Sequence, residues 1–474
     1  MEYANSFAPL ALILWLPLSV AVFGLLRPPV AVAAVLLGGT MFLPERVGFQ
    51  FEGLPDLGKR EISVLSALLG CLVWCPGRLV RARPGRGLES LVFALIAANF
   101  VTAATNRSWL FYGPKTLQGL TTWDAISETG ADVLTFGLPF FLGRALFWSR
   151  SDLIDLMKVL AIAGLVYAPL VLFEIRMSPM LNVWVYGFHQ HSWAQVHRFG
   201  GFRPLVFMHH GLALSVFVLI TAIAATTLAR IRQPLLGFPS GVPAGFLAIL
   251  LLLCRSLGSI AYGIAVLPLV AFAKPRWQLR AAVALSLCVL LYPAMRTAKV
   301  FPTERILTAA SWISPERAAS LETRFQSEDL LAEKAAQRIG FGWGPKGRNI
   351  VYDDRGRGTV ITDGFWIIIL GQKGLVGFYL TFGLLLLPVF LARNRLSRIA
   401  KREDRLLVSG LALLAVVYVV DLVPNGLFTS LPFFFAGTLT SGAVLLGAGR
   451  GSLDRRDSPA RRLRIRDSPG GRGS

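Results

Sequence analysis

The sequence predicts an all-α polytopic membrane protein with about twelve or thirteen transmembrane helices and one large external loop carrying an amphipathic helix. Hydrophobic residues make up 54% of the 474 residues, and charged residues only 16%. A soluble chain of this length needs more polar surface, so the bilayer is the expected solvent. Long apolar runs recur along the chain, for example at 10–26, 217–229 and 378–392.

Apolar windows that can cross the hydrocarbon region place the helices in order. The stretch 243–273 fits two short spans or one broken hairpin equally well. The N-terminus lacks the basic region of a signal peptide, so the first apolar run is expected to remain as a membrane helix. The predicted spans are 7–26, 29–43, 63–77, 88–105, 131–148, 156–174, 205–229, 243–255, 258–273, 280–296, 364–392, 406–424 and 431–448.

Basic loops predict which end of each helix faces the cytoplasm, because lysine and arginine concentrate on that side. The cytoplasmic loops are expected at 76–87, 228–234, 273–280 and 392–405. Alternation then places four segments together on the far side. They are 44–62, 106–130, 175–204 and 297–363.

The chain thus divides into four parts. Residues 1–296 are membrane helices with a loop rich in histidine and arginine at 175–204, and residues 297–363 form the large external loop. Residues 364–449 form the last membrane helices. The tail at 450–474 is polar and basic, so it is expected to be disordered.

The formal net charge of +21 does not indicate nucleic-acid binding. The charge lies in short loops between apolar runs and in the tail, where it sets membrane orientation and can contact anionic headgroups. The four cysteines lie in or beside apolar segments, without the paired spacing of a metal site or a disulfide framework.

The loop 297–363 contains a predicted amphipathic helix. It begins near Ser314 and Pro315, and apolar residues follow at helical spacing until FGWGPKGRN ends it with glycine and proline. Such a helix would lie over the membrane face.

All five histidines lie between residues 189 and 210. His189, His191 and His197 fit an aromatic loop at the membrane interface. His209 and His210 lie beside arginines at the start of a helix that Pro204 is expected to begin, and are candidates for function. A metal site is disfavoured, because neighbouring residues on a helix point about 100° apart.

Ionisable residues within apolar spans are costly and are candidates for function. Arginine suits diphosphate oxygens, because its planar fork of donors keeps its charge. The ionisable residues in spans are Arg144, Glu174, Arg176, Arg255, Lys373 and Asp421, and the arginines expected on the far face are Arg198, Arg203, Arg255, Arg317, Arg324 and Arg338.

Four motifs from about residue 170 onward resemble the O-antigen ligase and O-antigen polymerase superfamily of bacterial inner-membrane proteins. Two of them hold arginines before or between helices, and two join an amphipathic helix to a late membrane helix. They are RFGGFRPLVFMHHGLALS (198–215), LLLCRSLGSIAYGI (251–264), TRFQSEDLLAEKAAQRIGFGWG (323–344) and DGFWIIILGQKGLVGF (363–378).

The resemblance implies a glycosyltransferase that needs neither metal nor cofactor. Such an enzyme transfers a glycan linked to undecaprenyl diphosphate onto an acceptor hydroxyl at the periplasmic face, with its C-terminus in the cytoplasm. Its partners would be membrane lipids and other polysaccharide-assembly proteins, such as a chain-length regulator.

The resemblance also implies roles for particular residues. Positioned arginines would stabilise the negative charge that grows on the diphosphate, and a carboxylate or neutral imidazole would take the acceptor proton. Glu174 and Asp421 are expected to orient arginines by ion pairing. The predicted catalytic residues are Arg203, His210, Arg255, Arg324 and Asp363, and the predicted substrate-binding residues are Arg198, His209, Arg317 and Arg338.

One position departs from the family pattern. Ligases usually carry a histidine at the start of the late helix, where this chain has Asp363. A polymerase of exopolysaccharide or O-antigen repeat units is therefore expected, with an O-antigen ligase acting on lipid A core as the runner-up. A transporter or a non-enzymatic assembly subunit is the alternative of a different class.

Overall fold

The structure, a computed structural model, describes residues 4–51, 55–83, 85, 87–198, 200–313, 315–426 and 429–447. The tail predicted to be disordered, 450–474, lies outside these residues. The main helices of the bundle are α1 (Phe7–Leu25), α2 (Pro28–Phe42), α3 (Lys59–Trp74), α5 (Ser90–Thr105), α6 (Thr122–Asp132) continued through η1 (Val133–Gly137) into α7 (Leu138–Leu146), α8 (Arg150–Met177), α10 (Gly211–Arg230), α11 (Gly241–Leu253), α12 (Leu257–Phe272), α13 (Pro275–Thr297), α16 (Phe365–Arg395), α17 (Arg402–Leu422) and α18 (Leu431–Gly447).

The predicted class, an all-α polytopic membrane protein, is confirmed. Within the described residues, six helices are long and apolar enough to span a bilayer: α1, α8, α10, α13, α16 and α17. Shorter apolar helices lie beside them, including α11 and α12, which form two helices over the stretch 243–273. Every predicted span overlaps one of the helices named above.

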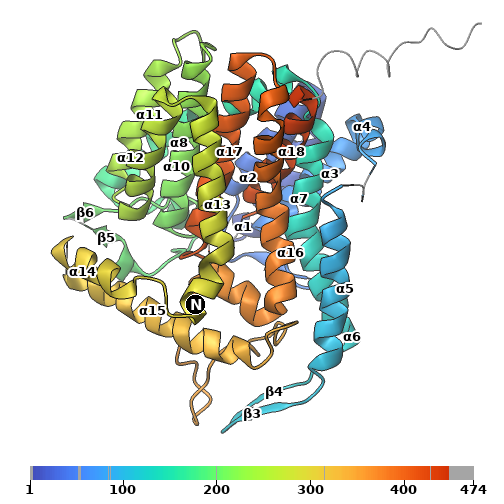
Figure 1. Cartoon of the computed structure of the whole chain (residues 1–474), viewed down its shortest axis with the longest axis vertical. Helices are drawn as coiled ribbons and strands as arrows, with labels where there is room; N and C mark the ends of the chain where they lie inside the picture. The colour runs from blue at the N-terminus through green and yellow to red at the C-terminus, as the bar shows by residue number, and fades with distance from the viewer. Residues whose placement is uncertain are drawn as a thin grey trace, which may run out of the picture.

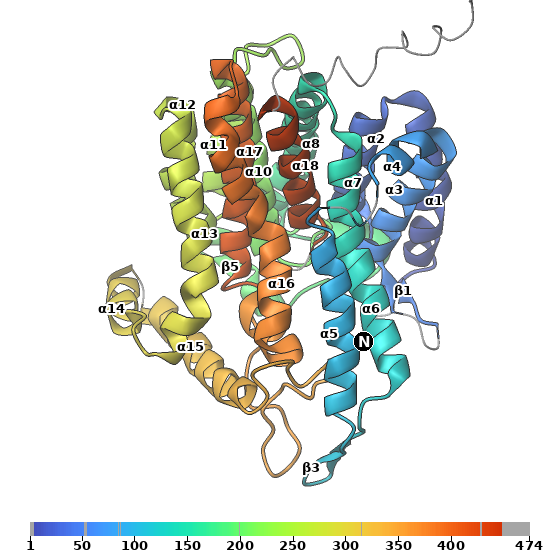
Figure 2. The ribbon, with the colours of Figure 1, turned by 45° about the vertical axis from the view of Figure 1, so that its right-hand side comes forward.

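Long connections between the helices gather at one end of the bundle, called here the α15 end (Figures 1 and 2). Helices α14 (Thr303–Ile313) and α15 (Pro315–Ala336) lie across it. Lys334 Nζ donates a hydrogen bond to the Tyr112 hydroxyl at 2.8 Å, and Lys59 Nζ to the Phe207 carbonyl at 2.8 Å. The first contact joins two of the segments predicted on the far side, 106–130 and 297–363, and the second joins a third, 44–62, to the loop that leads into α10.

Short elements complete the two ends. Three two-stranded antiparallel hairpins lie at the α15 end, and the remaining helices are each of six residues or fewer. The strands are β1 (Gly48–Phe49) with β2 (Leu57–Gly58), β3 (Leu110–Tyr112) with β4 (Lys115–Leu117), and β5 (His197–Arg198) with β6 (Gly201–Phe202); the helices are α4 (Pro76–Arg81), α9 (Leu181–Tyr186), η2 (Trp193–Gln195) and η3 (Leu396–Arg398).

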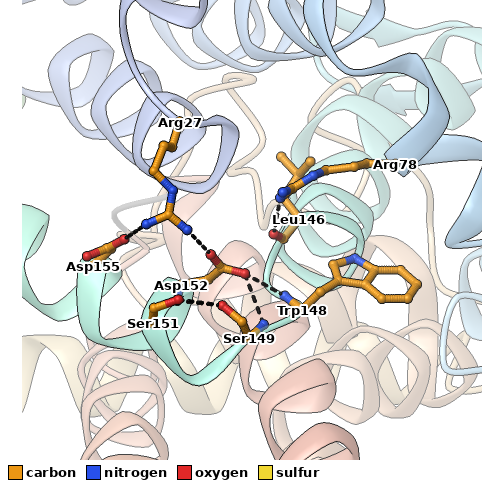
Figure 3. A network of polar contacts seen from close by, with 8 residues as sticks. All are labelled: Arg27, Arg78, Leu146, Trp148, Ser149, Ser151, Asp152 and Asp155. Carbon is orange, nitrogen blue, oxygen red and sulfur yellow. Dashed lines mark hydrogen bonds and ion pairs between the residues drawn. The ribbon is translucent and has the colours of Figure 1, made fainter. Parts of the chain in front are cut away.

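Polar contacts at the opposite end fix where α8 begins (Figure 3). The Ser149 hydroxyl accepts the backbone N–H of Asp152 at 3.1 Å, and the Asp152 carboxylate accepts that of Ser149 at 2.9 Å. This reciprocal cap satisfies two helix-end donors. Arg27, between α1 and α2, reaches Asp152 at 3.0 Å and Asp155 at 2.8 Å. Its side chain is 58% exposed, so these pairs contribute at most about 1 kcal/mol each.

Buried contacts anchor α15 to the bundle through Glu328. Its carboxylate accepts hydrogen bonds from the Trp366 indole at 3.0 Å and the Tyr292 hydroxyl at 3.1 Å, and it pairs with Arg296 at 3.3 Å. Burial raises the pKa of the Glu328 carboxyl, and these donors oppose that rise. The predicted amphipathic helix is therefore confirmed as α15, starting at Pro315, but α14 before it was not predicted.

Helix α16 is broken at Gly374, which has φ +65° and ψ −168°. The segment that follows α15 fills the break: Trp343 N–H donates to the Gly371 carbonyl at 2.9 Å, and Leu375 N–H to the Ile339 carbonyl at 2.7 Å. The backbone groups freed by the break are thus paired. The FGWG motif (341–344) and the GQKG motif (371–374) therefore pack against each other at this break in α16.

Gly374→Ala is expected to lower the free energy of unfolding by about 2–3 kcal/mol, because φ is positive there and a side chain clashes. An added Cβ would lie 2.3 Å from the Gly340 carbonyl oxygen. Thermal unfolding of the purified protein measures the effect. Gly383→Ala on the same helix is the control, since its nearest neighbour would be a side chain at 3.6 Å; equal melting of both variants would contradict the prediction.

The predicted start of α10 at Pro204 is wrong, since the helix begins at Gly211. The backbone N–H groups of Leu205 and Val206 donate to Glu174 Oε2 at 2.8 and 2.7 Å instead of entering a helix. The Glu174 carboxylate therefore accepts hydrogen bonds from backbone N–H groups, whereas it was expected to form an ion pair with an arginine. Its Oε2 thus holds the loop that leads into α10, and its Oε1 accepts the backbone N–H of Leu181 at the start of α9, at 3.2 Å.

Other charges within the spans are paired. The Arg144 guanidinium bonds to Glu89. Lys373 Nζ, buried beside the break in α16, pairs with Glu128 at 2.6 Å and Asp132 at 2.9 Å on α6. These carboxylates lie four residues apart on one helix face. The helix predicted from residue 131 begins earlier, at Thr122, because Thr121 and Asp124 form a reciprocal cap there.

Candidate functional site

A cavity of about 670 Å³ lies at the α15 end, between α15 and the bundle. Its walls come from the loop before α10, the turn between α11 and α12, α15, the start of α16 and the end of α17. The five residues predicted as catalytic all line this one cavity. They are Arg203, His210, Arg255, Arg324 and Asp363.

Two of the arginines are held by the loop before α10 and the α11–α12 turn. Arg203 is 5% exposed, and its Nη2 donates to the Ser256 hydroxyl at 3.1 Å. Arg255 has φ +53°, a conformation that costs a non-glycine residue about 1–2 kcal/mol. Its guanidinium lies against Gly201, where an added Cβ would be 2.5 Å from Arg255 Cζ. The close contact with Gly201 fixes where the Arg255 guanidinium lies in the cavity wall.

The third arginine connects two carboxylates. Arg324 Nε pairs with Asp363 Oδ2 at 3.1 Å, and its Nη1 donates to Asn425 Oδ1 at 3.4 Å. The Asn425 amide in turn donates to Asp421 Oδ1 at 3.1 Å. Asp421 is 3% exposed, whereas the Asp363 side chain is 38% exposed. The cavity therefore holds one reachable carboxylate and one buried carboxylate.

Three imidazoles form another part of the wall. The His191 ring lies 4.3 Å from that of His210 and 5.9 Å from that of His209, centroid to centroid. His189 instead stacks on Trp193 at 4.0 Å. His191 thus belongs with the cavity residues, although the sequence assigned it to the interfacial loop.

His210 caps α10. Its Nδ1 accepts the Leu212 backbone N–H at 2.9 Å, so the neutral ring carries its proton on Nε2, which donates to Gln195 Oε1 at 3.1 Å. Burial, aided by the positive charge of Arg203, lowers the pKa of His210 to about 2. With both ring nitrogens engaged, the arrangement does not support the predicted role of His210 as a general base.

Acid is expected to destabilise the protein partly through His210. An unfolded histidine titrates near 6.5, so between pH 6.5 and 2 the unfolded chain binds the extra proton. Neutral His210 makes its full contribution to the free energy of unfolding above pH 6.5, and this contribution falls by about 1.4 kcal/mol for each pH unit below 6.5. His210→Asn keeps a capping oxygen but does not titrate. Thermal melts at pH 7.5 and 5.5 should show a smaller drop for the variant; equal drops would contradict the shift.

Within the described side chains, the four residues predicted to bind substrate are not brought together in the cavity as the predicted catalytic residues are. His209 lines the cavity. Arg198 lies on β5 and Arg317 on α15, but their side chains are outside the described part. Arg338 follows α15, donates to the Thr105 carbonyl and packs over the Trp343 ring at 4.7 Å. It is absent from the cavity wall described here, so substrate binding by Arg338 gains no support.

Several lining residues escaped the sequence-based prediction. Ser256, Asn425 and Gln195 hold Arg203, Arg324 and His210, respectively. Only the position of Ser256, next to Arg255, offered a signal. In the described part of the chain, no group of three or more His, Cys, Asp or Glu side chains is placed to share a metal ion.

Comparison with known protein families and with curated proteins finds no match to this sequence. The cavity brings together three arginines, two carboxylates and three imidazoles in a helical membrane protein.

Proposed function

We propose that the protein is a glycosyltransferase that polymerises repeat units of an exopolysaccharide or O-antigen carried on undecaprenyl diphosphate. The observation that supports this most is the convergence of Arg203, Arg255 and Arg324 with Asp363 on one cavity. Arginine forks suit diphosphate oxygens, and a carboxylate within the same cavity can accept a proton. The resemblance of the four motifs points to the same reaction.

The reaction balances without a cofactor. The acceptor hydroxyl oxygen bonds to the anomeric carbon of the donor glycan as the bond from that carbon to the diphosphate oxygen breaks. The electron pair leaves with the diphosphate, and the hydroxyl proton goes to a carboxylate. The arginines stabilise the departing charge, so no acid need protonate the leaving group.

Asp363 is the proposed general base. Its exposed carboxylate lies at the start of α16, beside Arg324. His210 is not proposed as the base for proton removal, because each of its ring nitrogens already forms a hydrogen bond. Asp421 and Asn425 hold Arg324 from the buried side.

The proposal places the protein in a bacterial inner membrane. The α15 end would face the periplasm, where lipid-linked repeat units are assembled, and the basic loops would face the cytoplasm. Partners would be membrane lipids and assembly proteins such as a chain-length regulator.

The test uses the purified protein and lipid-linked repeat units from the source bacterium lacking this gene. A ladder of longer lipid-linked glycans, formed without any other acceptor, is expected. Transfer only after lipid A core is added would replace the polymerase with a ligase. No product under either condition, with correctly folded protein, would contradict glycosyl transfer and favour transport or assembly.

A further inference from the structure

A second large cavity lies at the end opposite the candidate active site. It measures about 650 Å³ and is bounded by the start of α13, the end of α16, η3 and the start of α17. Five of its eight lining residues are cationic and none is a carboxylate. The eight are Lys274, Pro275, Arg276, Arg393, Leu396, Ser397, Arg402 and Arg405.

The charges around this cavity are not neutralised within the described part of the chain. None of the five cationic side chains forms an ion pair there with a carboxylate. The nearby acidic residues Glu403 and Asp404 pair with Arg150 on α8. Arg405 Nε donates to the Ile399 carbonyl at 2.6 Å. Five like charges around one space repel one another unless an anion enters.

The start of α13 adds to this positive field. Lys274 is the N-cap residue of α13, no side chain caps this helix by a hydrogen bond, and its first turn holds no acidic residue, whereas the first turn of α17 holds Glu403 and Asp404. A helix N-terminus carries partial positive charge, so lysine at the cap is unfavourable there. An anion beside the start of α13 would offset this effect.

The surroundings identify the kind of anion. Trp277 on α13 is 50% exposed and directly follows Arg276, which lines the cavity. Exposed tryptophan side chains settle at the headgroup level of a bilayer. Basic pockets between membrane helices suit lipid phosphates.

We propose that this cavity binds the phosphate groups of an anionic phospholipid headgroup, and that the doubly charged diphosphatidylglycerol is bound more tightly than lipids with one phosphate. Arginine forks from α13, α16 and α17 would each contact phosphate oxygens. The site is independent of the proposed glycosyl transfer, because no residue is shared between the two cavities.

The test is thermal unfolding and native mass spectrometry of the full chain in detergent with added diphosphatidylglycerol, phosphatidylcholine or inorganic pyrophosphate. The diphosphatidylglycerol should bind and raise the melting temperature, pyrophosphate should bind more weakly because it lacks acyl chains, and phosphatidylcholine, which has no net charge, should do neither. Arg276→Gln/Arg402→Gln should weaken its binding at least about tenfold, since two charge-assisted contacts are lost.

The control is Arg81→Gln/Arg232→Gln. It removes the same net charge from exposed positions that do not line the cavity, at the same end. Equal binding by the two double variants would overturn the site. Stabilisation by pyrophosphate without stabilisation by the lipid would overturn the lipid assignment. Melting without additives shows that each variant is folded.

Discussion

Arg324→Ala is expected to lower glycan transfer by about 10²–10³-fold while the protein remains folded in the membrane. The guanidinium joins Asp363, at 3.1 Å, to Asn425, at 3.4 Å, and so connects the reachable carboxylate with the buried one. If it also neutralises the departing diphosphate, its loss acts on the transition state. Its side chain is 33% exposed, so the cost to folding is small.

The measurement is the rate of ladder formation with purified variants. Arg324→Lys should recover only part of the rate, because an ammonium keeps the charge but not the fork. Arg305→Ala is the matched control, since Arg305 is an exposed arginine on α14 at the same end and does not line the cavity. Full activity in Arg324→Ala would remove the arginine from the mechanism. A comparable loss in Arg305→Ala would point to a general effect of charge.

The convergence of the predicted residues was accessible from sequence because membrane topology limits the choices. Once basic loops fix the alternation, helix ends on one side must share a surface. Arg255 at a turn, Arg324 on an amphipathic helix and Asp363 before a long apolar run therefore had to lie at one end. The structure adds that they line one cavity.

What the sequence could not provide depends on contacts between distant segments. Glu174 is an acid in an apolar run, and only the fold shows that it binds the backbone of Leu205 and Val206 and delays the start of α10. Gly374 is one glycine among many, and its positive φ is meaningful only because the segment around Gly340 enters the break. Local pattern cannot locate such partners.

The histidines illustrate the same limit. Sequence position assigned His191 to the interfacial loop and His209 and His210 to the start of a helix, yet the His191 ring lies close to both of the other rings in the folded chain. Spacing also allowed His210 to be a base, whereas its contacts with Leu212 and Gln195 make it a helix cap. Residue type can nominate a site, but hydrogen-bond partners decide the role.

Asp363→Asn is expected to reduce the turnover number for transfer by about 10²–10⁴-fold with little change in the KM for the donor. The amide has nearly the same shape but cannot take the acceptor proton. Asp421→Asn should have a smaller effect, because Asp421 is 3% exposed and acts through Asn425 on Arg324. Asp354→Asn, on an exposed loop residue of the same end, is the control and should be neutral.

Turnover at saturating acceptor distinguishes the two carboxylates, provided that melting temperatures confirm folding. A loss confined to Asp421→Asn would transfer the base role to the buried carboxylate, and the acceptor would then have to approach from the α17 side of the cavity. Equal, modest losses in both variants would mean that the carboxylates only hold Arg324, so proton removal would fall to water or to the substrate. A large loss in Asp363→Asn alone is the result that proton transfer to Asp363 requires.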